Sequence, residues 1–236
     1  MKAIFSKEMK AYFHGLSGYF FLAAFVFFLS VYFIRDAFYL GNIGSNALFS
    51  SVSVILVLLL PVITMRSFAA EQQNGTDILL LTGPASPLAI VLGKFFASGC
   101  VFFIGLILSG LSPLILFFSG RFYVGDILLS YLGFGLLGLS IIAIGLFFSS
   151  LSSHPLRAGL VTIGALLILW MFDNVLPNLT DSSLYGVLSS VSVFGRLENF
   201  QYGLLSFSSI LFFLSLTILF LFLTAKSLDQ RRWSRS

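Results

Sequence analysis

The chain has 236 residues, of which 58% are hydrophobic and 9% are charged, and its formal net charge is +4. A soluble domain usually carries about a quarter charged residues, so this composition excludes an ordinary soluble protein and indicates a chain that lies in lipid. In such a chain the excess of basic residues sets membrane orientation rather than nucleic-acid binding. The one cysteine, Cys100, excludes a disulfide within the chain.

The first predicted element is an amphipathic helix over residues 2–16. At helical spacing, one face is apolar and the other carries basic and small polar side chains. We expect this helix to lie in the membrane interface, with Gly15 and Gly18 allowing a bend into the first span. A plain extension of the first span is the alternative. The interfacial residues would be Lys2, Phe5, Met9, Lys10, Tyr12 and Phe13.

Six apolar segments follow, and each is long enough to cross about 30 Å of hydrocarbon. They cover residues 17–34, 46–65, 88–118, 127–150, 156–172 and 204–225. If the N-terminus is cytoplasmic, ten of the 13 Lys and Arg residues fall in cytoplasmic segments, and Arg35, Arg121 and Arg196 fall outside. This asymmetry follows the positive-inside rule. The sequence therefore predicts one all-α transmembrane domain over residues 1–236, with six spans and both termini in the cytoplasm.

The longest cytoplasmic connection, 66–87, has the signals of a short helix. Asn74-Gly75 breaks the chain, Thr76 is expected to be an N-cap, and Asp77 lies in the first turn of the apolar segment that follows. A helix of one or two turns is unstable alone. We therefore expect it to pack on the membrane face or on a partner protein.

Two other connections are interpreted from local signals. Ser86 and Pro87 are typical of an N-cap and a first helical position, so they predict the start of span three. The outer segment 173–203 is too polar and too interrupted to span the membrane. Short interfacial or re-entrant helices are expected there.

Motifs for chemistry are few. Gly93-Lys94 lacks the other residues of a P-loop, and no cluster has metal-ligand spacing. Residues 15–18 match the GxSG of rhomboid intramembrane proteases, but the Ser17 nucleophile would need a histidine base within hydrogen-bond reach. His14 is expected on another helix face and His154 at the end of another span. A flexible joint is therefore favoured over a protease site.

The spans are expected to carry almost no charge, and six charged residues are expected at span ends: Arg35, Asp36, Arg121, Asp126, Arg157 and Asp173. This argues against a secondary transporter or a pump that works alone, because relays and coupling ions need intramembrane charges. Small residues share helix faces in spans three and four. They predict close helix packing, with the lining of a translocation path as the alternative: Ser98, Gly105, Ser109, Gly138 and Gly145.

The order of elements, with the loop pattern E-x-x-x-G-T-x-x-x-L-L-x-x-P, resembles the permease subunits of type-2 ABC exporters of the gliding-motility and nitrous-oxide-reductase-maturation type. The matching residues are Glu71, Gly75, Thr76, Leu80, Leu81, Pro84, Pro87, Gly93 and Lys94. A second, partial match precedes the last span, at Phe194, Leu197, Glu198, Asn199, Phe200 and Gly203. Arg196 and Leu197 stand there where the family often has His and Phe.

The resemblance implies a permease that pairs with a second copy or a paralogue in the bacterial cytoplasmic (inner) membrane. Separate cytoplasmic ABC ATPase subunits would bind ATP and Mg, so the chain itself would have no cofactor and no enzymatic activity. An envelope auxiliary protein is a further expected partner, and nucleic acid is not. A membrane scaffold without transport is the alternative. The implied ATPase interface is Glu71, Gln72, Asn74, Gly75, Thr76, Asp77, Leu80 and Leu81.

Overall fold

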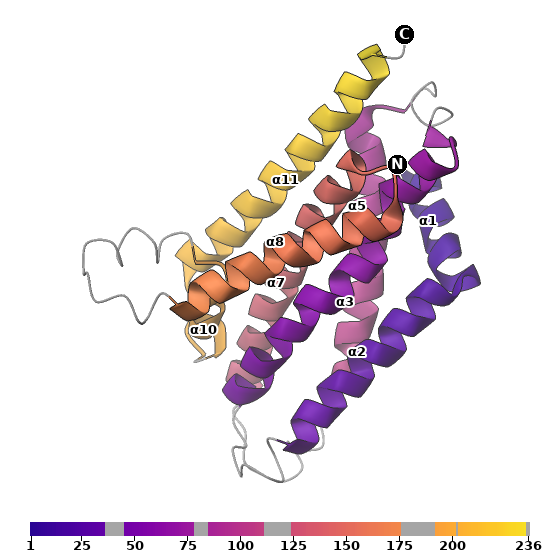
Figure 1. Ribbon diagram of the computed structural model, residues 1–236. Helices are drawn as coiled ribbons and strands as arrows, with labels where there is room; N and C mark the ends of the chain where they lie inside the picture. Colours follow the sequence, from indigo (N-terminus) through magenta and orange to yellow (C-terminus); the bar gives the residue numbers. More distant parts are fainter. Residues whose placement is uncertain (36–44, 78–84, 111–123, 176–191, 202, 235–236) are drawn as a thin grey trace.

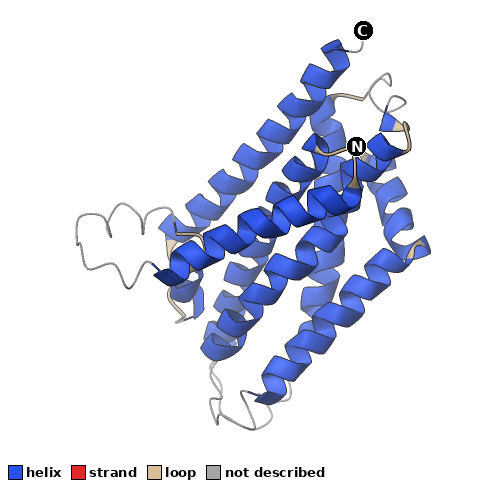
Figure 2. Ribbon diagram, in the orientation of Figure 1, coloured by secondary structure: helices blue, strands red, loops and turns tan. Residues whose placement is uncertain are grey.

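The computed structural model describes residues 1–35, 45–77, 85–110, 124–175, 192–201 and 203–234. Within these residues it consists of helices without strands (Figure 2). The helices are α1 (Lys2–His14), α2 (Leu16–Ile34), α3 (Ser45–Gln73), α5 (Pro87–Ser109), α7 (Val124–Leu151), α8 (Pro155–Val175), α10 (Gly195–Gln201) and α11 (Phe207–Ser234).

Six of these helices, α2, α3, α5, α7, α8 and α11, are long and apolar enough to cross a membrane. The predicted all-α class and the number of spans are therefore confirmed, and the chain is a multi-pass membrane protein. Both chain ends lie near the same end of the bundle (Figure 1). We call this the terminal end of the bundle, and the opposite one the far end.

The predicted end of span two was wrong. Helix α3 does not stop at residue 65 but continues to Gln73, because residues 66–73 include Ala, Glu and Gln, which favour helix, and contain neither Gly nor Pro. The helix ends at the predicted break, where Gly75 has a φ of +69°, a conformation that glycine adopts at little cost. The last span is also longer than expected, since α11 reaches Ser234.

Several other local predictions were confirmed. Gly15 is extended and separates α1 from α2. A Cβ at Gly18 would lie 2.7 Å from the carbonyl oxygen of Tyr12, so this glycine lets α2 start close to α1. The Ser86 Oγ accepts a hydrogen bond from the Ala89 amide at 3.3 Å, with Pro87 at the first position of α5. The short helix predicted after Asp77, including Leu80 and Leu81, lies outside the described residues, as does most of 173–203.

Aromatic side chains fill the middle of the bundle. Phe25 of α2, Phe102 of α5 and Phe134 of α7 are fully buried, and their ring centroids are 6.1–6.5 Å apart. Around this cluster α3 packs on α7 and α8, α11 packs on α7, and α2 packs on α3 and α5. Helix α1 packs mainly on α5, which places its charged residues beside the terminal ends of the spans.

Candidate functional site

The terminal end of the bundle contains a buried ammonium group, that of Lys94 in α5. Its side chain is 1% exposed. The Nζ atom lies 2.7 Å from Glu8 Oε1, 2.9 Å from Glu71 Oε2 and 2.6 Å from the carbonyl oxygen of Ser67. Three acceptors match the three protons of an ammonium, so the charge is buried with all its donors satisfied. The ring of Phe68 adds a cation–π contact at 4.9 Å.

Glu71 joins Lys94 to the protein surface. While its Oε2 contacts Lys94, its Oε1 accepts a hydrogen bond of 2.8 Å from Lys7 of α1. Two cations and two carboxylates thus form a neutral set that links α1, α3 and α5. We call Lys7, Glu8, Glu71 and Lys94 the charge network. Neutrality and full pairing are the conditions under which charges are tolerated away from water.

The first helix supplies two members of the charge network because it turns one face toward α5. Ile4, Glu8 and Tyr12 follow each other at helical spacing on that face. Close approach is possible because position 93 is a glycine, whose Cβ would lie 3.0 Å from the Ile4 side chain. The Tyr12 hydroxyl donates a hydrogen bond to the Ile63 carbonyl of α3 at 3.3 Å.

Two side chains of α1 have shifted pKa values. Burial lowers the pKa of the Lys7 ammonium, but its hydrogen bond to Glu71 and the charges of Glu71 and Glu8 outweigh this, and the net pKa is raised. Burial raises the pKa of the Tyr12 phenol, and the charge of Glu8 adds to the effect. Both groups therefore keep the protons that form their hydrogen bonds at neutral pH.

Helix α7 fixes the segment of α3 that carries Glu71. The Ser149 hydroxyl accepts from the amides of Phe68 and Ala69 at 3.1 and 3.2 Å and donates to the Met65 carbonyl at 3.1 Å. One turn further along, Gln72 Nε2 donates to the Ser150 carbonyl at 2.9 Å. The position of Glu71 is thus fixed in two ways. Its own helix, α3, is hydrogen-bonded to α7, and its carboxylate is paired with the two lysines on α5 and α1.

The chain beyond α3 is tied back to Glu71 as well. The amide of Thr76 donates to the Glu71 carbonyl at 2.9 Å, and the Thr76 hydroxyl donates to the same oxygen at 3.3 Å. Asn74, Gly75 and Thr76 are exposed, whereas Asp77 is buried. Of the predicted interface residues that the structure describes, only the turn 74–76 is exposed. Gln72 is half-buried, Asp77 is buried, and Glu71 is 13% exposed and already paired through both oxygens.

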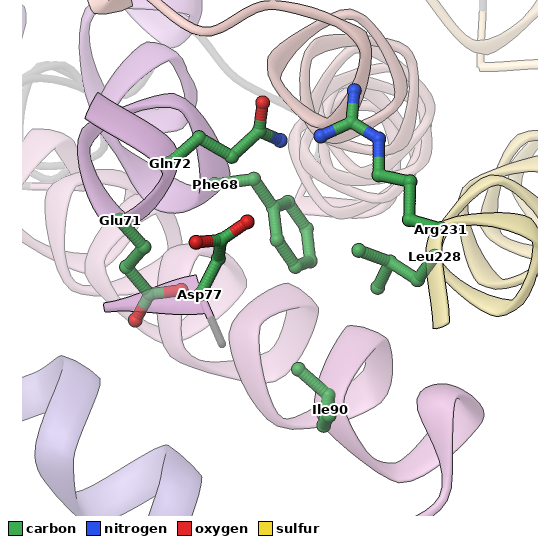
Figure 3. Close-up of a pocket in the computed structure, with 7 residues that line it drawn as sticks. All are labelled: Phe68, Glu71, Gln72, Asp77, Ile90, Leu228 and Arg231. Carbon is green, nitrogen blue, oxygen red and sulfur yellow. The ribbon is translucent and has the colours of Figure 1, made fainter. Parts of the chain in front are cut away.

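A small pocket lies beside the charge network, and Figure 3 shows the residues that line it, with Phe68 between Asp77 and Leu228 in this view. Its presence shows that the last span reaches the predicted interface region, which the sequence pattern did not indicate. The lining residues come from α3, from the residue after the turn, and from α5 and α11: Phe68, Glu71, Gln72, Asp77, Ile90, Leu228 and Arg231.

The small residues predicted for helix packing lie between helices of this one chain. A Cβ at Gly105 would lie 3.0 Å from Phe25 of α2, whereas one at Gly138 would overlap Phe102 of α5 and one at Gly145 would overlap Thr64 of α3. The hydroxyls of Ser98 and Ser109 donate to carbonyls of their own helix, those of Lys94 and Leu106. A path-lining role is not tested by these contacts.

The residues expected at the membrane interface divide by face. Lys2 and Lys10 are exposed, Phe5, Met9 and Phe13 are half-buried, and Tyr12 is buried against α3. The predicted helix 2–16 ends earlier than expected, at His14, and Leu16 instead starts α2 and is exposed.

Neither histidine forms a catalytic pair with Ser17 in the part of the chain that the structure describes, as the sequence predicted. His14 Nδ1 lies 3.0 Å from the Lys10 carbonyl oxygen. His154 lies in the turn before α8, and Ser17 has no hydrogen bond to either imidazole. The geometry gives no support to a serine nucleophile with a histidine base.

Sequence reasoning missed the charge network, although a signal was available. The expectation that the spans carry almost no charge overlooked Lys94, which lies inside the predicted span 88–118 and is buried. Glu8 stands between Ile4 and Tyr12 on one helix face, and a carboxylate in such a position requires a cation. The two signals are 86 residues apart, and only the fold brings them together.

Comparisons with known proteins assign no family. No protein-family model matches the chain, and no curated protein sequence matches it.

Proposed function

We propose that this protein is the membrane-spanning permease subunit of a type-2 ABC exporter, driven by separate ATPase subunits at the terminal end of the bundle. In this proposal the terminal end faces the cytoplasm of a bacterium. The sequence asymmetry of Lys and Arg supports that orientation, and the loop pattern around Glu71 supports the family.

The observation that carries the proposal is the position of Glu71. Its carbonyl binds the exposed turn through Thr76, and its carboxylate binds α5 through Lys94 and α1 through Lys7. A force on the turn would thus act on three helices at once. Coupling between distant sites requires such a physically connected element that changes as a unit.

Transport by rigid tilting of helices fits the rest of the bundle. The described middle of the spans is packed with aromatic and small side chains and carries no buried carboxylate, so energy would come from outside the chain rather than from a coupling ion. A partner ATPase is the simplest such source. The proposal leaves the transported substrate open.

The test is ATP hydrolysis by the complex that forms when the chain is co-expressed with candidate ABC ATPase subunits from the same genome. Thr76→Trp places a large side chain on the exposed turn and should abolish complex formation without unfolding the bundle. Ser153→Trp is the matched control, because Ser153 is exposed in the turn between α7 and α8 at the same end. It should leave the complex intact.

Coupling is tested separately from docking. Lys94→Met with Glu8→Gln removes the central ion pair but leaves the Lys7–Glu71 pair in place. This double variant should bind the ATPase and lose the dependence of ATP hydrolysis on the permease. If no ATPase co-purifies with the unaltered chain, or if Thr76→Trp has no effect, the scaffold alternative replaces this proposal.

A further inference from the structure

An open cleft with a volume of about 500 Å³ lies at the terminal end, away from the charge network. It is formed where α3 meets the start of α8. The two helices approach closely there because residue 159 is a glycine, whose Cβ would lie 3.0 Å from Met65 Sδ. The cleft is lined by Met65, Arg66, Gln73, His154, Leu156 and Arg157. We call it the basic cleft.

The charges of the basic cleft are of one sign. Arg66 comes from α3 and Arg157 from α8, and both side chains are exposed. Neither has an ion-pair partner within the described residues, and no acidic side chain lines the cleft there. Two guanidinium groups beside an amide and an imidazole are suited to a phosphate, because guanidinium binds phosphate oxygens in a bidentate manner.

An apolar surface continues from the basic cleft along α8. Leu156, Leu160 and Ile168 are 70–73% exposed and follow one another on a single helix face. Gly164 lies between the last two, and no other heavy atom lies within 4 Å of where its Cβ would be. A phosphate in the cleft that also carries an acyl chain would place that chain on this face, which would otherwise contact only bulk lipid.

We propose that the basic cleft binds the phosphate headgroup of an anionic phospholipid, with an acyl chain along the exposed face of α8. Basic pockets between spans at the cytoplasmic side bind such headgroups in general. A soluble phosphate would use the two arginines but not the apolar face. The proposal depends only on the terminal end lying at headgroup level, so it stands independently of the proposed transport function.

The test is native mass spectrometry of the full chain in detergent, titrated with phosphatidylglycerol or with phosphatidylcholine. One phosphatidylglycerol should bind more tightly than phosphatidylcholine. Arg66→Gln with Arg157→Gln should weaken its binding roughly 30-fold, about fivefold for each basic residue near an anionic headgroup. Lys2→Gln with Lys10→Gln removes the same charge from exposed positions at the same end and should leave the tight site in place.

Two further measurements separate lipid from other occupants. Leu160→Gln should weaken the binding of phosphatidylglycerol and leave any binding of glycerol phosphate unchanged. Thermal unfolding without added lipid should be the same for the double arginine variant and the parent, since both side chains are exposed. The proposal is overturned if the double variant still binds phosphatidylglycerol tightly, or if glycerol phosphate competes for the site as well as the intact lipid does. It is also overturned if the double variant instead loses a dimer that forms without lipid.

Discussion

The terminal end and the middle of the bundle are held together by different interactions. At the terminal end, ion pairs of 2.7–2.9 Å join α1, α3 and α5 through four charged side chains. In the middle, the rings of Phe25, Phe102 and Phe134 pack together, and glycine provides the space that they need. Ion pairs thus link the helices at the terminal end, whereas the aromatic cluster in the middle depends on shape.

This difference shows where each kind of interaction is effective. Burial of apolar surface gives little driving force for helix association in lipid, because lipid tails are as apolar as leucine, so the helices there associate through close packing. Charged partners specify one arrangement, since a missing partner leaves a charge unpaired. The end at which we propose a partner protein binds is therefore the end at which ion pairs specify the positions of α1, α3 and α5.

The largest effect should come from Lys94→Met. It leaves Glu8 as a nearly buried carboxylate without its cation, and breaking a buried ion pair from one side typically costs about 3–5 kcal/mol. The free energy of unfolding in mixed micelles measures this. Adding Glu8→Gln should recover most of the loss, because no unpaired charge then remains. Equal destabilisation by the single and double variants would show that the pairing is not what matters.

A smaller effect is expected in the middle of the bundle from Gly138→Ala. The new methyl group would overlap the ring of Phe102, which is fully buried between its aromatic neighbours, and overpacking costs about 1–3 kcal/mol. Gly164→Ala is the matched control, since its Cβ meets no other atom within 4 Å. The midpoint of thermal unfolding should fall for Gly138→Ala only. A fall for both variants would show that the loss of glycine from the backbone, and not overlap with Phe102, causes the effect.

The smallest effect should come from Lys7→Gln. The Lys7 side chain is 57% exposed, and an exposed ion pair contributes at most about 1 kcal/mol. Because the pKa of Lys7 is raised in the folded protein, its contribution is present below the ordinary value of 10.5 and is lost as the pH rises through the folded value. The difference from the parent should therefore vanish in strong alkali. Lys10→Gln, on the exposed face, should show no difference at neutral pH.

Much of the fold could be predicted because its signals are local. Hydropathy alone predicts six spans, since a span needs about 20 apolar residues in a row. Gly15, Asn74-Gly75 and Ser86-Pro87 mark ends that the structure has. The end of span two was misplaced because several of the last residues of α3 are polar, and polarity was interpreted as a loop although Ala, Glu and Gln there favour helix.

The sequence by itself determined the class, the number of spans and the break after α3, because each depends on residues that are neighbours in the chain. Only the tertiary structure decided that Lys94 meets Glu8 and Glu71, that Ser149 bonds to the backbone of α3, and that Arg66 and Arg157 share a cleft. These contacts join residues from different helices. Their geometry is set by how the helices pack, and that packing depends on shape throughout the bundle.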